Sequence, residues 1–120
     1  MKPVQVHEFK TSGVTGEEYY LPDEKRIAGN PKQTLWNHYT DASGRFSTGV
    51  WQSEVGKWHI AYTEEEYCRI LGGTSIISDA QGVAVTVSAG ESFVIPRGFS
   101  GTWEVVEPTR TIYVIYEPEA

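Results

Sequence analysis

Hydrophobic and polar residues alternate along most of the chain between Gln33 and Tyr116. Such alternation in short runs, separated by Gly, Pro, Asn, Asp and Ser, is typical of β-strands with one buried face. The predicted strands cover residues 34–40, 46–52, 58–62, 66–71, 74–78, 83–87, 92–95, 102–106 and 111–116. This many short strands without a long helix predict an all-β fold, either a sandwich or a barrel.

Residues 90–98 show the pattern in its shortest form. Gly90 permits a sharp turn, Phe93 and Ile95 share one face of a four-residue strand, and Pro96 removes a backbone donor. A strand so short suits the rim of a small barrel, although an ordinary hairpin in any all-β domain has the same signals.

One segment has a helical alternative. Residues 64–71 begin with three glutamates, and Tyr67, Ile70 and Leu71 would lie on one face of a helix. The following Gly72-Gly73 pair and the strands on either side favour a strand with a bend at the glycines.

The first 32 residues lack the alternation, so the expected domains are an arm at 1–32 and a barrel at 33–120. Residues 4–9 could form a short edge strand, and residues 23–27 one helical turn. The apolar patch Tyr19-Tyr20-Leu21 has no reason to stay exposed, which predicts a homodimer. We expect the arm to lie on the barrel or on a partner subunit, with disorder as the alternative.

Composition narrows the classes of protein. A chain of 120 residues can bury one core, and its net charge of −6, with scattered basic residues, argues against a nucleic-acid partner. No apolar run is long enough to span a membrane, and Cys68 as the single cysteine excludes an internal disulfide. We therefore expect a soluble, cytoplasmic protein.

Two stretches together resemble the sequence motifs of cupins. Gly56-Lys57-Trp58 followed by the segment Glu66 to Gly73 resembles the first motif, which ends in a glutamate, six residues and a glycine. Gly90 to Gly98 resembles the second motif, and the residues between the two fit the short hairpin of small cupins. The wording of three further stretches is similar to small cupins related to the cupin domain of (S)-ureidoglycine aminohydrolase: Gly49-Val50-Trp51, Glu66-Tyr67-Cys68 and Gly101-Thr102-Trp103-Glu104-Val105.

This resemblance implies a single-domain double-stranded β-helix, the RmlC-like jelly-roll barrel, with a pocket inside one end. It also implies a dimer, often formed by exchange of N-terminal strands, which would suit the arm.

Most metal cupins hold Mn, Fe, Ni or Zn with three histidines and one glutamate. Carried over by the resemblance, these positions fall on Ile60, Tyr62, Glu66 and Gly101, so that only the glutamate is present. The glutamate, two histidines and glutamine of the aminohydrolase type are not matched either. We therefore expect no bound cofactor, with a divalent metal as the alternative.

The histidines do not supply the missing ligands. His7 lies in the arm, His38 is on a strand face that the pattern does not assign, and His59 should point away from the side of Ile60. A register slip of one residue would turn His59 inward.

The alternation of side chains also predicts what faces the pocket. The expected lining consists of Trp58, Ile60, Cys68, Phe93, Ile95, Gly101 and Trp103, beside Glu66 and Tyr62 as candidate acid and base. The alternative is that these residues only pack the core. A nucleophilic thiol needs a basic neighbour that lowers its pKa, and the sequence assures Cys68 of none.

Three functions remain open. A metal-free pocket could bind a small polar or cationic metabolite, with Glu66 as the counter-charge and Trp58 or Trp103 over the cation. An aminohydrolase-like enzyme could use Glu66 and Tyr62, with or without metal. The third reading is a structural dimer with a vestigial pocket.

Overall fold

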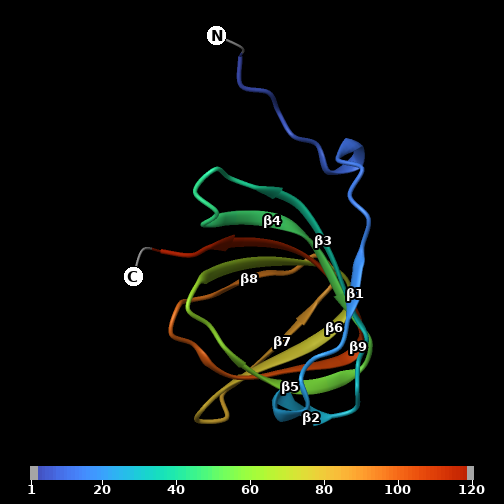
Figure 1. Cartoon of the computed structure of the whole chain (residues 1–120). Helices are drawn as coiled ribbons and strands as arrows, with labels where there is room; N and C mark the ends of the chain where they lie inside the picture. The colour runs from blue at the N-terminus through green and yellow to red at the C-terminus, as the bar shows by residue number, and fades with distance from the viewer. Residues whose placement is uncertain (1–2, 119–120) are drawn as a thin grey trace.

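Two long, bent strands, β6 (Glu65–Asp79) and β9 (Ser100–Tyr116), form the frame of the barrel (Figure 1). They appear in a computed structural model that describes residues 3–118. The two strands pair antiparallel with each other over nearly their whole lengths, with register shifts between Ile70 and Ser75. Each strand therefore contributes one half to each of two curved sheets.

The remaining elements complete the two sheets. They are η1 (Phe9–Thr11), β1 (Glu17–Tyr19), η2 (Asp23–Lys25), β2 (Arg26–Ala28), β3 (Gln33–Thr40), β4 (Phe46–Ser53), β5 (Gly56–Ala61), β7 (Ala84–Ser88) and β8 (Ser92–Ile95). One sheet has the order β1-β3-β4-β9-β6-β8, and the other has the order β2-β5-β9-β6-β7. All pairs are antiparallel, which confirms the predicted all-β jelly-roll barrel.

A tight backbone contact marks the corner where β6 and β9 pass between sheets. Gly73 has a positive φ of 84°, and a Cβ atom there would lie 2.0 Å from the carbonyl oxygen of Pro108. Only glycine fits both the conformation and the space. The bend predicted at Gly72-Gly73 is therefore present within β6, whereas Glu107-Pro108, where the pattern predicted a break between two strands, marks a bend within the continuous strand β9.

Strand alternation in β6 is clear from residue burial. Cys68 and Ile70 are fully buried, whereas Tyr67, Arg69 and Leu71 are exposed. The prediction of a strand here is confirmed and the helical alternative is excluded. The core cluster comprises Trp58, Cys68, Ile70, Ile77, Val87, Ile95, Trp103 and Val105.

Two short strands of the expected arm belong to the sheets. β1 pairs with β3, and β2 pairs with β5, so residues 17–28 extend both sheets by one edge strand. The predicted helical turn is present as η2. The edge strand expected at residues 4–9 is wrong, because residues 3–8 have no regular structure and Val4 and Val6 are exposed.

The segment before β1 contacts the end of the barrel at Tyr39, whose ring lies 4.9 Å from that of His7, and at His38. The Phe9 ring stacks on His38 with 4.4 Å between ring centroids, and Ser12 Oγ lies 2.5 Å from His38 Nδ1. Figure 1 shows that the chain before η1 extends away from the barrel. Among the described residues, no helix is long and apolar enough to cross a membrane.

Candidate ligand-binding site

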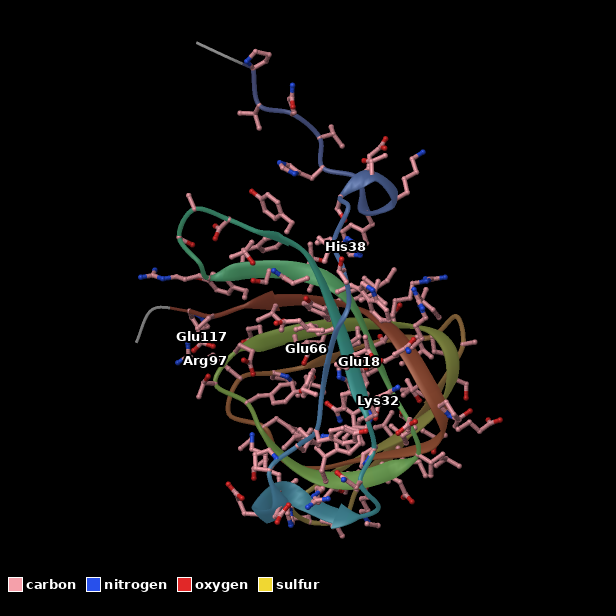
Figure 2. The ribbon with its side chains drawn as sticks, turned by 45° about the vertical axis from the view of Figure 1, so that its right-hand side comes forward. Glu18, Lys32, His38, Glu66, Arg97 and Glu117 are labelled. Atoms are coloured by element: carbon pink, nitrogen blue, oxygen red, sulfur yellow. The ribbon has the colours of Figure 1, made fainter. Side chains whose placement is uncertain are left out.

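A cavity of about 650 Å³ lies inside the barrel and is lined by residues from both sheets. Glu66 projects into it from β6, and Figure 2 shows this side chain between the walls of the barrel. The volume of the cavity is in the range of cavities that hold small organic molecules.

The Glu66 carboxyl is the central polar group of the cavity. Burial raises its pKa from the ordinary value of 4.5 to about 6. The Tyr62 hydroxyl and the Cys68 thiol lie beside it, and their interaction with the carboxylate opposes part of that rise. Glu66 is therefore mostly ionised at neutral pH, and its pKa lies close enough to neutrality for the carboxyl to gain and lose a proton there.

Tyr62 is fixed by the loop that follows β8. Its backbone N–H donates to the carbonyl of Phe99 over 2.9 Å, and its carbonyl accepts from Gly98 over 2.7 Å. Burial and the nearby Glu66 charge raise the pKa of the Tyr62 hydroxyl far above its ordinary value. The hydroxyl stays protonated and serves as a donor beside the carboxylate.

Cys68 lies two positions after Glu66 on the same face of β6. It is fully buried, and burial together with the Glu66 charge raises the pKa of its thiol. A thiol needs a lowered pKa to act as a nucleophile, so this one supplies a neutral neighbour for Glu66 and no covalent chemistry.

Three tryptophans form an aromatic wall. The Trp58 and Trp103 rings are nearly parallel with centroids 6.5 Å apart, and Trp51 meets Trp103 edge-on at 5.3 Å. Trp58 and Trp103 are cross-strand partners, and Trp103 Nε1 donates to Ser75 Oγ over 3.0 Å. The sequence indicated Trp58 and Trp103 by strand alternation, but Trp51 was seen only as part of a motif.

A buried amide lies in the same wall. Gln33 at the start of β3 is 2% exposed, and its Oε1 accepts a hydrogen bond from Trp51 Nε1 over 3.2 Å. Its Nε2 has no hydrogen-bond partner within residues 3–118. Sequence reasoning missed Gln33, because a single glutamine at a strand end carries no signal of burial.

The segment around β1 closes one side of the cavity. Tyr19 and Leu21 line it, while Tyr20 between them is 58% exposed. Burial raises the pKa of the Tyr19 hydroxyl, and the Glu66 charge adds to this rise. Two of the three residues in the patch that suggested a dimer thus serve this chain's own cavity.

Five of the nine predicted site residues line the cavity and four do not. Those that line it are Trp58, Ile60, Tyr62, Glu66 and Trp103. Cys68 and Ile95 are instead packed in the core, and the Phe93 ring lies behind the wall, 5.9 Å from that of Trp103. Gly101 is absent from the lining, since a Cβ atom there would lie 1.9 Å from the Ser78 carbonyl oxygen.

The donor set does not fit the usual cupin metal. His59 borders the cavity but is exposed, and His38 is engaged with the N-terminal segment. Across residues 3–118, no three His, Cys, Asp or Glu side chains are grouped so as to hold a metal ion. The crowding at Gly101 also leaves no room for a ligand side chain at that position.

Comparisons with solved structures agree with this architecture. The EutQ protein of Clostridium difficile matches with a TM-score of 0.65 and 22% identity, covering 74% of this chain and 65% of its own. A protein of unknown function from Pseudomonas syringae pv. tomato matches with a TM-score of 0.77 and 18% identity, covering 87% of this chain and 45% of its own. This chain therefore spans less than two thirds of either protein.

A Thermotoga maritima protein of the same family as the Pseudomonas protein has 29% identity and a TM-score of 0.53, covering 54% of this chain and 74% of its own. No curated protein matches the sequence. Residues 40–113, more than half of the chain, match the family model of the EutQ-like cupin domain. The chain belongs to the EutQ-like cupin domain family.

Proposed function

We propose that this cupin binds a small organic amine inside the barrel, without a protein-held metal, and that Glu66 is the counter-charge. The observation that carries the proposal is the Glu66 carboxylate in a cavity walled by tryptophans. A buried carboxylate is costly unless it is paired, and the nearby Tyr62 and Cys68 are both neutral. A bound cation would supply the missing charge.

The charges around the cavity favour a cation over an anion. Glu17 and Glu64 line it together with Glu66, against Lys25 as the one Lys or Arg among the described lining residues. The aromatic rings add to this preference, because the negative face of an indole attracts ammonium groups.

The test is calorimetric titration of the purified protein with a panel of small amines and with the matching carboxylates. We expect amines to bind, with affinity rising as the pH increases through about 6, since binding requires the ionised form of Glu66. Glu66→Gln should abolish this binding while the fold persists, as checked by circular dichroism.

Glu65→Gln is the matched control, because Glu65 is the neighbouring strand residue and does not line the cavity. Equal amine binding by the Glu66→Gln variant and the wild type would overturn the proposal. So would the absence of binding by every amine in the panel, or stoichiometric Mn, Fe, Ni or Zn in the purified protein.

A second candidate is an aminohydrolase-like enzyme, favoured by the pKa of about 6 for Glu66. A carboxyl with such a pKa can accept and return a proton near neutral pH, and Tyr62 would hold it in position. The measurement is release of ammonia from ureidoglycine-type substrates, with and without added Mn. Binding without turnover by the wild type would leave only the first proposal.

A further inference from the structure

We infer that the cavity recognises an elongated amine with an oxygen acceptor at its far end, which accepts a hydrogen bond from the Gln33 side-chain amide. This inference rests on the proposed binding of an amine at Glu66. It adds a second anchor and a class of ligand: amines that end in an amide, another carbonyl group or a hydroxyl.

The orientation of the Gln33 amide follows from its partner. An indole N–H is only a donor, so Trp51 Nε1 must face the amide oxygen of Gln33, at 3.2 Å. The NH₂ group then faces away from Trp51 Nε1 and is an unpaired donor, in a residue that is 2% exposed. Buried polar groups are nearly always hydrogen-bonded, so an unpaired donor in a cavity wall indicates a missing acceptor.

Three other polar side chains of the cavity wall, Tyr113, Asn37 and Thr111, already have protein partners. Tyr113 Oη donates to Asn37 Oδ1 over 2.8 Å, and Asn37 Nδ2 donates to Thr40 Oγ1 over 2.8 Å. Thr111 Oγ1 donates to the carbonyl of Arg69 over 2.8 Å. Within residues 3–118, Arg26 Nε is the other buried side-chain atom without a partner, and Arg26 does not line the cavity.

The two anchors lie at different levels of the barrel. Gln33 pairs through Ser53 with Thr109 of β9, whereas Glu66 pairs with Ile115, six positions further along the same strand. Because each strand residue advances the chain by about 3.3 Å, a ligand that reaches both groups must be extended. A compact amino alcohol would reach only one of them.

The test compares ω-amino amides of increasing chain length with alkylamines of equal length, by calorimetry on the full chain. One neutral hydrogen bond predicts that the best amide binds about three- to tenfold more tightly than its alkylamine. Gln33→Met should remove this gain, so that the amide and the alkylamine of equal length bind this variant with equal affinity, whereas Glu66→Gln should abolish binding of both. Gln33→Glu keeps an acceptor for Trp51 and in its ionised form has no donor, so at alkaline pH, where alkylamines are still protonated, it should also remove the gain.

Gln81→Met, at an exposed turn, is the control and should keep the gain. Thermal unfolding identifies a variant that has lost its fold. If Gln33→Met has lost its fold, the Gln33→Glu variant decides the outcome. Amine binding that depends on Glu66, with no gain from the amide in the wild type, would overturn this inference and leave the proposed function intact. If no amine binds at all, both fail.

Discussion

Burial of Glu66 links the stability of the barrel to pH. The folded state holds the proton of this carboxyl more tightly than the unfolded chain does, since its pKa is about 6 instead of 4.5. Below pH 4.5 both states are protonated, and above pH 6 the folded state contains a desolvated charge. The contribution of Glu66 to stability is therefore lost as the pH rises through this window.

We predict that the free energy of unfolding of the wild type falls by up to about 2 kcal/mol between pH 4.5 and 7, relative to Glu66→Gln. Urea unfolding at a series of pH values measures this difference, with Glu65→Gln as the control. A difference between the Glu66→Gln variant and the wild type that is independent of pH would contradict the prediction.

The sequence was informative at Glu66 and silent at Gln33 for physical reasons. Glu66 lies in a motif whose spacing to Gly73 places it on a known strand of the barrel. The role of Gln33 depends on a contact with Trp51, on the neighbouring strand, and on burial that alternation along one strand does not reveal. Alternation also separates the two faces of a strand without distinguishing cavity wall from core. This is why Cys68 and Ile95, which lie in the core, were predicted to line the cavity.

Among the elements, the strands with clear alternation were predicted and the two N-terminal edge strands were not. β1 and β2 have three residues each and no buried residue, so their pairing comes from the free edges of β3 and β5. The bend in β6 was predicted correctly at its glycines. The continuity of β9 through Glu107-Pro108 was not evident, because a corner and a strand end give the same break in the pattern.

We predict that Gly73→Ala destabilises the barrel by about 3 kcal/mol or more, because it adds a Cβ atom against Pro108 and requires a positive φ. Gly72→Ala is the matched control: it has no heavy atom within 4 Å of the added Cβ. Denaturant midpoints of the two variants should differ widely. Similar midpoints would show that the corner relaxes easily.

For the whole molecule, the homodimer stays a prediction, but it no longer rests on the patch Tyr19-Tyr20-Leu21. Tyr19 and Leu21 contribute to the cavity, so the most exposed large apolar side chains of the described N-terminal region are Val4, Val6 and Tyr20. Val4 and Val6 lie on a segment that extends from the barrel, where a second copy could cover them (Figure 1).

We expect light scattering to give a dimer at tens of micromolar, and the double variant Val4→Ser/Val6→Ser to shift it toward monomer. Val83→Ser, an exposed valine beside β7, is the control for a general loss of surface hydrophobicity. A wild-type monomer at this concentration would refute the prediction.

The sharing of β6 and β9 between the two sheets has a consequence for folding. Neither sheet can open without breaking pairs that the other needs, so the barrel should unfold as one cooperative unit, with its slowest amide hydrogen exchange in these two strands. β9 also supplies the partner of β4 and β5. A nascent chain that ends before residue 100 therefore carries β4, β5 and β6 with unpaired edges, and closure must wait for contacts distant in sequence. Such folding is slow and exposed to aggregation until the last strand arrives.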